Sequence, residues 1–310
     1  MYKLLFRYEE NYFNCRNAQL VSHLRTKGVP VDYYFYNCFE NTKTIYDHLF
    51  TQNKNRWLFD TNCISKNQDF NLLGVNVVEK KYTRFQSAKE HIAQLVKEDL
   101  SIFIWLCNYY IPHREHYQQY RSFHSFIFDD LIEGEEPHYV VQDPPKFRGE
   151  ISEAIIKKAF TATPGMIRGI TYLDYASVEV DTKNLMNKYK EWLNSFTDDF
   201  STYMIVQKLI PNHLIKDVEK FMYFFAILFG SRLLFSRFLE VMSFDQALVN
   251  EAAECSGISE SIHSMLLNYY EKKEEVDIEW IISQITVLVE KEKALISALK
   301  KADLASDHLL

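Results

Sequence analysis

Hydrophobic positions follow a helical period in two segments of the N-terminal half. In CRNAQLVSHLRTKG, residues 15–28, three apolar residues share one face before a glycine ends the pattern. The same spacing recurs in RFQSAKEHIAQLVKED, residues 84–99. LSIFIWLCNYY, residues 100–110, is instead a continuous apolar run, which is typical of a buried strand. The pattern therefore predicts two amphipathic helices and one central strand.

Extended segments are predicted around these elements. The aromatic stretch at 29–39 is expected to be extended, and the segment at 74–82 to be a short strand or loop edge. At 123–145, two β-rich runs flank EGEEP and predict a hairpin with a short loop. A short helix is expected at 152–160, followed by a linker or a strand-like crossing at 161–175.

The remainder of the chain has the periodicity of amphipathic helices. This pattern covers residues 180–303, and its last helix is expected at about 276–302. Because proline and glycine interrupt helices, we expect breaks at Pro211, near Gly230 and at Gly257.

The order of these elements predicts an α+β protein with a domain at 1–165 and a helical domain at 166–310. The chain has 310 residues, 47% of them hydrophobic and 25% charged, which is the composition of a folded globular protein. A net charge of −7 argues against a general nucleic-acid binder. The longest apolar run, FMYFFAILFG, is too short to cross a bilayer, and the N-terminus lacks the pattern of a signal peptide. We therefore expect neither nucleic acid nor membrane as a partner.

The five cysteines are widely spaced and show no zinc-ligand spacing. They predict free thiols in a cytoplasmic protein. In YYIPHREHYQQY, His113, Glu115 and His116 form a weak metal motif, and a loop beside the active site is the alternative interpretation. We expect no bound metal.

Three residues form a candidate catalytic set. If the hairpin turns between Glu133 and Gly134, His124 lies directly opposite Asp143, where a carboxylate orients an imidazole. Cys15 opens a helix, whose N-terminus lowers the pKa of a thiol. Cys15, His124 and Asp143 then supply nucleophile, base and orienting acid. Taken singly, each residue has a structural interpretation, as a buried filler, a core histidine and a turn residue.

Four stretches, NCRNAQLVSHLRTKGV, VKEDLSIFIWLCNYYIP, FHSFIFDD and YVVQDPP, carry a resemblance to a known family. A cysteine that opens the first long helix, with histidine and aspartate on a late hairpin, resembles the papain-like cysteine peptidases. Taken together, the stretches resemble the family of butirosin biosynthesis protein H, in its N-terminal domain. The resemblance covers about residues 1–160 and implies a papain-like fold there, with a mostly helical region following.

The resemblance implies acyl transfer. The family prototype moves an acyl chain from a carrier-protein thioester to an amine, and a related enzyme joins acyl chains to a small diamine. An acyl or peptidyl carrier protein and an amine or diamine acceptor are therefore the expected partners. The donor is carried on phosphopantetheine and is already activated, so no further cofactor is expected. Cys15 would carry the acyl group and His124 would act as the base.

One position departs from the papain-like pattern. Those peptidases place a glutamine six residues before the cysteine to complete the oxyanion hole, whereas this chain has Glu9. An ionised glutamate donates no hydrogen bond. Asn11, Asn14 or backbone N–H groups are the alternative donors.

Two further groups have open interpretations. Four tyrosines are candidates to line a substrate channel, or are core residues: Tyr34, Tyr36, Tyr109 and Tyr110. A basic stretch is either a docking surface for an acidic carrier protein or a solvated face: Lys146, Arg148, Lys157 and Lys158. Two other functions use the same residues: a cysteine peptidase or thioester hydrolase, and a non-catalytic scaffold.

Overall fold

The computed structural model describes residues 11–64, 67–144, 147–174 and 178–306. These residues divide into two compact units that alternate along the chain. The sheet unit comprises residues 15–29, 73–174 and 178–179, and the helical unit comprises residues 11–14, 30–72 and 180–306. The architecture is therefore mixed α and β, with a helical C-terminal region, as the sequence predicts at this level.

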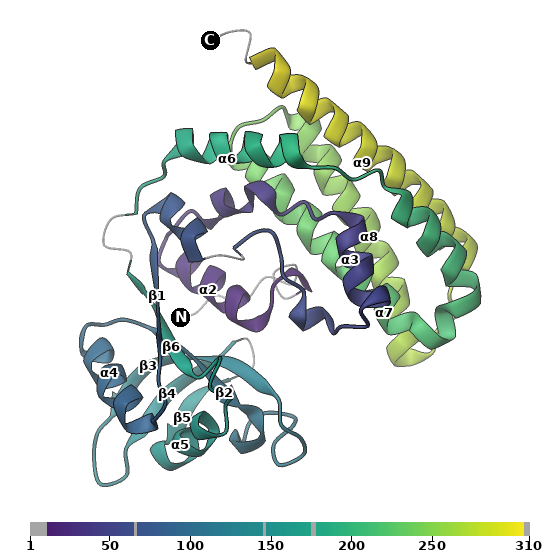
Figure 1. Ribbon diagram of the computed structural model, residues 1–310. Helices are drawn as coiled ribbons and strands as arrows, with labels where there is room; N and C mark the ends of the chain where they lie inside the picture. The colour runs from purple at the N-terminus through teal and green to yellow at the C-terminus, as the bar shows by residue number, and fades with distance from the viewer. Residues whose placement is uncertain (1–10, 65–66, 145–146, 175–177, 307–310) are drawn as a thin grey trace. The chain divides into compact units, whose positions relative to one another are not determined.

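Six strands form the sheet of the sheet unit, and all its neighbouring strands are antiparallel (Figure 1). Their order across the sheet is β1-β6-β2-β3-β4-β5. Their bounds are β1 Asn76–Lys81, β2 Ile102–Cys107, β3 Phe123–Ile132, β4 His138–Asp143, β5 Phe147–Ser152 and β6 Gly169–Asp174. The predicted central strand is β2, which is apolar on both faces because both are covered.

Helices cover the two faces of this sheet. Helices α4 (Phe85–Lys97) and α5 (Glu153–Thr161) bury their apolar stripes in one core, together with Ile102 and Ile104 of β2. Successive side chains of a strand point to opposite faces. Phe103 therefore lies on the other face, where its ring contacts His23 of α2 (Cys15–Thr26) at 5.5 Å. All three predicted helices of this unit are confirmed.

The predicted hairpin is confirmed, but its predicted register is wrong. Ile127 lies opposite Gln142, and the register shifts at a bulge between Phe128 and Asp130. Continued along the strands, this pairing displaces His124 by two residues from the position opposite Asp143. The connection from 133 to 137 and the bulge both add residues that a simple two-residue turn lacks.

The segment 161–175, which the sequence predicts to be a linker or a strand-like crossing, contains strand β6. β6 pairs with both β1 and β2, so the sheet continues beyond residue 166. Gly169 is required there, because an added Cβ would lie 2.5 Å from the carbonyl oxygen of Lys80. A domain boundary at 165/166 stays a prediction.

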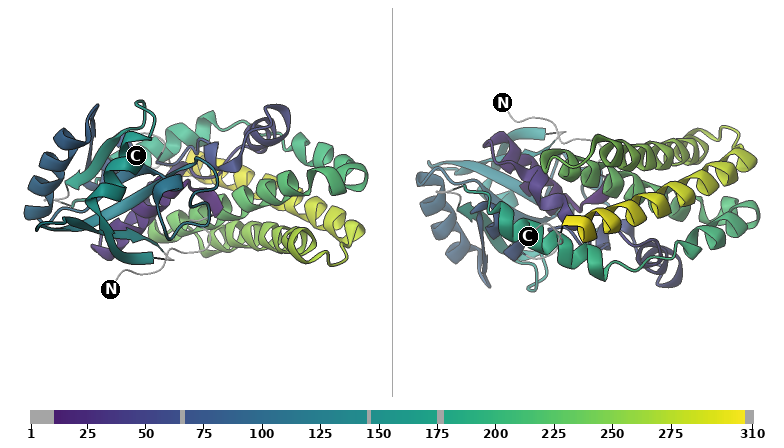
Figure 2. Two further views of the ribbon diagram at one scale, coloured as in Figure 1. Left: turned by 90° about the horizontal axis from the view of Figure 1, so that it is seen from below. Right: turned by 90° about the horizontal axis from the view of Figure 1, so that it is seen from above.

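Long helices dominate the helical unit: α6 Thr182–Ser195, α7 Ser201–Val241, α8 Gln246–Lys272 and α9 Ile278–Ser306. Figure 2 shows α7, α8 and α9 side by side. Shorter elements precede them: η1 Val31–Asn37, α3 Thr42–Tyr46, η2 Asp47–Thr51, η3 Arg56–Leu58 and η4 Asn67–Leu73. None of the described helices is long and apolar enough to span a membrane.

The predicted helix breaks are wrong. Helix α7 runs through Pro211 and Gly230, and α8 runs through Gly257. Pro211 is exposed, so water can hydrate the carbonyl group that its missing N–H leaves free. The irregular backbone lies later, at Asp217, where φ is −117°. Burial of the helix faces outweighs the weak helix propensity of the two glycines.

The aromatic stretch at 29–39 is not extended. It forms the 3-10 helix η1, which buries Val31, Tyr34 and Phe35. Buried positions three and four residues apart belong to a helical period, and the many aromatic residues concealed that period.

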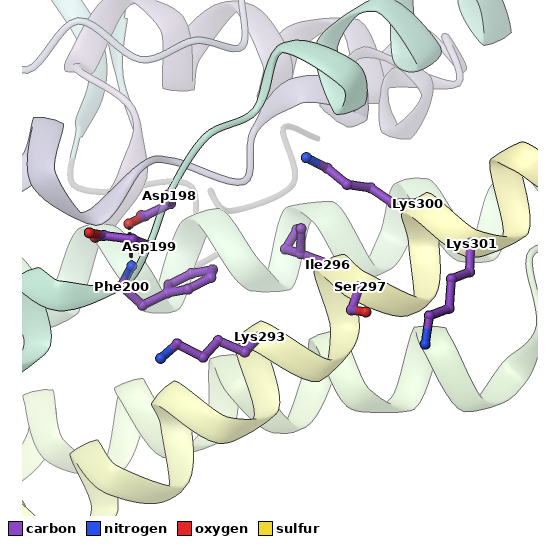
Figure 3. A pocket seen from close by; sticks show the side chains of 8 residues that line it. All are labelled: Asp198, Asp199, Phe200, Lys293, Ile296, Ser297, Lys300 and Lys301. Carbon is purple, nitrogen blue, oxygen red and sulfur yellow. Dashed lines mark hydrogen bonds between the residues drawn. The ribbon is translucent and has the colours of Figure 1, made fainter.

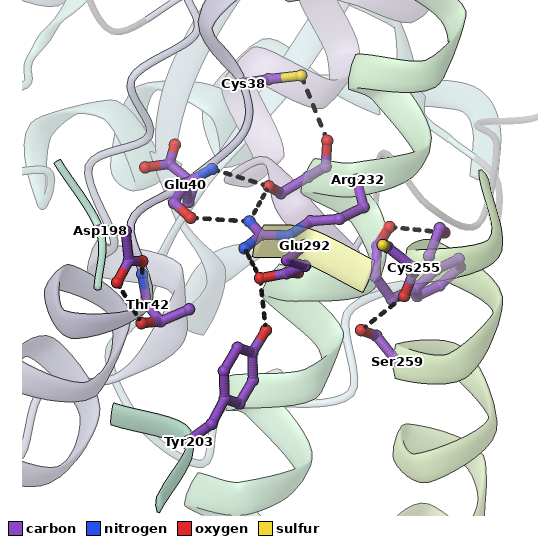
Figure 4. A network of polar contacts seen from close by, with 12 residues as sticks. Cys38, Glu40, Thr42, Asp198, Tyr203, Arg232, Cys255, Ser259 and Glu292 are labelled. Carbon is purple, nitrogen blue, oxygen red and sulfur yellow. Dashed lines mark hydrogen bonds and ion pairs between the residues drawn. The ribbon is translucent and has the colours of Figure 1, made fainter. Parts of the chain in front are cut away.

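A buried polar network joins several elements of the helical unit (Figure 4). Arg232 forms two bonds with Glu292, of 2.7 and 3.0 Å, and donates a third, of 2.8 Å, to the carbonyl oxygen of Glu40. Its guanidinium also lies 3.8 Å from the ring centroid of Phe39, and Tyr203 donates to Glu292. Both charges of the pair are fully buried and hydrogen-bonded, as burial of charge requires.

Candidate active site

Cys15 is the first residue of α2 and is half-buried. Its sulfur hydrogen-bonds the His124 ring and accepts from the backbone N–H groups of Arg16 and Ser125. The Arg16 N–H belongs to the first turn of the helix, where backbone donors have no partner within the helix. A thiolate at this position therefore has donors from two elements.

The edge of β3 explains how α2 reaches this position. β4 pairs with β3 only as far as Ile127, so the outer edge of residues 123–126 is open. Gln19, one turn along α2 from Cys15, donates its side-chain N–H to the Ser125 carbonyl oxygen at 2.8 Å. The Ser125 N–H faces Cys15. Helix α2 thus lies beside the part of the β3 edge that β4 does not cover.

The imidazole of His124 connects Cys15 to Asp143. Its Nε2 lies 2.7 Å from Asp143 Oδ1, and the thiol hydrogen-bonds the same ring. In the observed register Asp143 is a diagonal neighbour of His124, within reach of long side chains. The three residues are therefore brought together by a geometry different from the direct pairing that the sequence predicted.

Asp143 is buried and accepts from three side chains. Besides His124, Arg114 Nη1 lies 2.7 Å and His113 Nε2 lies 3.2 Å from its Oδ2. Sequence reasoning assigned His113 to a metal motif or to a loop beside the site, and it missed Arg114. The only sequence signal for Arg114 is that it follows His113 in the loop before β3. No strand pairing that can be read from the sequence connects this loop with Asp143.

The pKa values of the three groups are coupled through these contacts. Burial raises the pKa of the Cys15 thiol, but the charge and hydrogen bond of His124 lower it more, so it falls below its usual range. Burial opposes the charge of His124, yet Cys15 and Asp143 raise its pKa to about 9. The pKa of Asp143 is lowered because the bonds from His113 and His124 and the charge of Arg114 outweigh burial. This electrostatic pattern favours a thiolate beside an imidazolium.

Cys38 and Cys255 lack such a setting. None of the five cysteines forms a disulfide, and Cys38, Cys63, Cys107 and Cys255 are buried. Burial raises the pKa of Cys38 and of Cys255, which keeps these thiols protonated. Cys15 therefore has the electrostatic setting of a reactive thiol.

Asn11 and Asn14, the predicted oxyanion donors, are assigned to the helical unit. Glu9 lies outside the described residues. Asn11 belongs to the helical unit, where its Oδ1 and backbone oxygen accept from Arg56. An oxyanion role for Asn11 or Asn14 stays a prediction, and the backbone N–H groups of Arg16 and Ser125 that face the Cys15 sulfur are alternative donors.

The four candidate tyrosines divide between the units. Tyr34 and Tyr36 are buried in the helical unit, where Tyr34 donates to the Phe70 carbonyl oxygen at 2.9 Å. Tyr109 and Tyr110 are half-buried in η5 (Asn108–Tyr110) of the sheet unit, with ring centroids 5.0 Å apart. Core packing accounts for the first pair, and a substrate-binding role stays a prediction for all four.

The structure gives His113 of the candidate metal motif a contact with Asp143, and a docking role for the basic stretch stays a prediction. Among the described residues, no group of three or more His, Cys, Asp or Glu side chains is placed to hold a metal ion. His113 bonds Asp143 instead. Of the basic stretch, Lys146 lies outside the described residues, Lys157 and Lys158 are exposed on α5, and Arg148 lies 3.8 Å from Asp129.

An open cavity of about 410 Å³ lies in the helical unit (Figure 3). Its lining mixes charges of both signs: Asp198, Asp199, Phe200, Lys293, Ile296, Ser297, Lys300 and Lys301. The carboxylates accept from backbone N–H groups around the start of α7, and Lys300 donates to the carbonyl oxygen of Phe196. Asp198, Asp199 and Lys300 therefore contribute to the local fold.

Comparison with known proteins shows a similarity to a curated transferase. No family model matches the chain. The chain is similar to a transferase of Niallia circulans, at 26% identity over 238 residues, which cover 76% of this chain and 78% of the relative. The name of that enzyme gives ribostamycin and a 4-(gamma-L-glutamylamino)-(S)-2-hydroxybutanoyl group on the BtrI acyl-carrier protein as its substrates. The resemblance to the family of butirosin biosynthesis protein H is thereby confirmed.

Proposed function

We propose that this chain is a cysteine-dependent acyltransferase whose sheet unit has a papain-like fold. It takes an acyl or peptidyl group from a carrier-protein thioester, holds it on Cys15 and passes it to an amine. The acceptor is a small amine or diamine, and the reaction belongs to the biosynthesis of a specialised metabolite in the cytoplasm.

The observation that carries this proposal is the continuous set of contacts from Cys15 through His124 to Asp143. A thiol at a helix N-terminus, bonded to an imidazole that is itself bonded to a buried carboxylate, has the parts of an activated nucleophile. The helix that carries the cysteine, the antiparallel sheet and the late hairpin also occur in the order that a papain-like fold requires.

The relative supports the kind of donor. Its name describes transfer of an acyl group from an acyl-carrier protein, and the similarity extends over three quarters of this chain. We therefore propose a carrier protein as the partner. The acyl donor then arrives on phosphopantetheine, and no other cofactor is needed for the steps below.

Acylation of Cys15 begins when its thiolate attacks the thioester carbonyl carbon. The carbon–sulfur bond to pantetheine breaks, and the departing thiolate takes the proton of the His124 imidazolium. We propose the backbone N–H groups of Arg16 and Ser125, which face the sulfur, as donors to the developing oxyanion.

Transfer to the amine reverses the proton's path. His124, now neutral, accepts a proton from the amine as its nitrogen attacks the acyl carbon. The bond to Cys15 breaks, and the sulfur leaves as a thiolate beside the imidazolium. Asp143 stays ionised throughout and orients the ring.

Intact-protein mass spectrometry with an acyl-loaded carrier protein or an acyl-pantetheine mimic tests this proposal. We expect a mass gain equal to the acyl group, absent in Cys15→Ala and discharged quickly by added amine. Discharge by water as fast as by amine would indicate a hydrolase. If no adduct forms while the carrier protein still binds, Cys15 is not the nucleophile and the scaffold alternative holds.

A further inference from the structure

We propose that Arg114 and His113 are positioning residues that hold the Asp143 carboxylate fixed and charge-balanced behind His124. This inference rests on the proposed role of Cys15 and His124 as nucleophile and base. It adds two residues, adjacent in the loop before β3, that act on His124 through Asp143.

The geometry places both side chains on one oxygen of Asp143. Oδ2 receives Arg114 Nη1 at 2.7 Å and His113 Nε2 at 3.2 Å, which leaves Oδ1 to His124. Because Oδ2 is bonded twice, the carboxylate cannot rotate without breaking two hydrogen bonds. The oxygen that orients His124 is thereby fixed.

The ring of His113 is itself held in place. It stacks on Phe147 of β5, with centroids 3.6 Å apart and ring planes at 5°, and its edge meets Phe126 at 6.0 Å. Phe126 also contacts the His124 ring at 5.0 Å, so one aromatic side chain lies against both histidines. An imidazole packed between two rings loses little further freedom when it donates to Asp143.

Among the described residues, three side chains that carry or can carry a positive charge contact Asp143. The loop before β3 contributes His113 and Arg114, and β3 contributes His124. On β5 the residue opposite Asp143 is Phe147, and the next charge along that strand, Arg148, lies beside Asp129. Arg114 therefore supplies the opposite full charge that balances the carboxylate.

Balance of this kind sets how strongly His124 holds its proton. A lone buried carboxylate would stabilise the imidazolium more and the thiolate less than a carboxylate paired with a guanidinium does. In acyl transfer His124 must both give a proton to the leaving thiolate and take one from the amine, so a moderate affinity serves both steps.

The test is the pH dependence of Cys15 alkylation by iodoacetate, with Cys15→Ser as the blank and no carrier protein present. The rate rises as the Cys15 thiol ionises, and it falls as the His124 imidazolium, whose charge attracts the anionic reagent, loses its proton. The variants are Arg114→Gln, which removes the charge, and Arg114→Lys, which keeps it. Lys97→Gln, an exposed position on α4, makes the same charge change away from the site. His113→Phe keeps an aromatic ring on Phe147 and removes the N–H donor.

We expect Arg114→Gln to move both limbs of the pH profile upward by about 1 pH unit. Arg114→Lys should restore the wild-type limbs, and Lys97→Gln should match the wild type because its charge is screened by solvent. His113→Phe should lower the plateau rate several-fold, since a less constrained carboxylate orients the imidazole less well.

Two results would overturn the inference in different ways. Unchanged limbs in Arg114→Gln, with an unchanged plateau in His113→Phe, would show that neither residue acts on His124, while the proposed function stands. If wild-type Cys15 instead titrates as an ordinary thiol near pH 8.5, the nucleophile assignment fails and the positioning role fails with it.

Discussion

Replacing Asp143 by asparagine should disrupt the candidate site without changing its volume. All three partners of this carboxylate are N–H donors: His124, His113 and Arg114. An amide offers one oxygen and one NH₂ group. If the amide oxygen faces Arg114 and His113, the NH₂ group faces His124 Nε2, which accepts only in the neutral tautomer whose N–H points toward Cys15. If the amide turns the other way, its NH₂ group faces Arg114, which can only donate. The substitution therefore either holds His124 in a form that cannot accept a proton from Cys15 or creates a donor–donor contact with Arg114.

The magnitude follows from the charge that is lost. Burial alone would lower the pKa of His124, and the neighbouring Cys15 and Asp143 raise it to about 9. Loss of an opposite charge in direct contact shifts a pKa by about 1–3 units. With a fall of about 2 units, the imidazolium fraction at pH 8 would drop from roughly 90% to roughly 10%.

The assay is again the alkylation rate of Cys15 against pH. The thiolate–imidazolium pair is lost as the pH rises through the pKa of His124, so the upper limb in Asp143→Asn should move to lower pH. The direction is opposite to that expected for Arg114→Gln. An upper limb that stays near pH 9 in Asp143→Asn would refute the claim that this carboxylate supports the imidazolium.

Three predictions concern stability. Arg232→Met should cost about 3–5 kcal/mol in urea unfolding because it leaves Glu292 buried and unpaired, and adding Glu292→Leu should recover most of that loss. A double variant as unstable as the single one would contradict this account. Burial raises the pKa of Glu40 from 4.5 to about 7, so the folded protein keeps this proton to a higher pH than the unfolded chain does. The stability that protonated Glu40 contributes is therefore fully present below pH 4.5 and is lost as the pH rises through about 7. Glu40→Gln should remove this part of the pH dependence in thermal unfolding, and an unaltered profile would exclude Glu40 as its source. Gln19→Leu leaves the buried Ser125 carbonyl oxygen without its side-chain donor, which should cost about 1–3 kcal/mol; a change below a few tenths would show that water replaces that donor.

Local patterns in the sequence were sufficient for most elements of the sheet unit. The apolar stripe of α4, the continuous apolar run of β2 and the two halves of the hairpin are confirmed because each depends on periodicity within one segment. Helical periodicity likewise identified the C-terminal region. Pro211 and Gly257 did not end helices, because packing along a long buried face outweighs the cost of one unfavourable residue.

Pairings between distant segments could not be read in the same way. The bulge near Asp129 shifts the hairpin register, and nothing in the local sequence requires an extra residue at that point. The contact between His124 and Asp143 was predicted correctly from an incorrect register, since the two side chains meet along a diagonal. The prediction therefore depended on residue types and their order more than on geometry.

The sequence by itself determined the candidate set Cys15, His124 and Asp143, the helix that carries the cysteine and the resemblance to a family of carrier-dependent transferases. Only the tertiary structure decided that α2 takes the open edge of β3 and that Arg114 and His113 share one oxygen of Asp143. The physical reason is that periodicity records which face of an element is buried. Hydrogen bonds between segments more than a hundred residues apart, such as Gln19 to Ser125, depend on where whole elements end relative to one another.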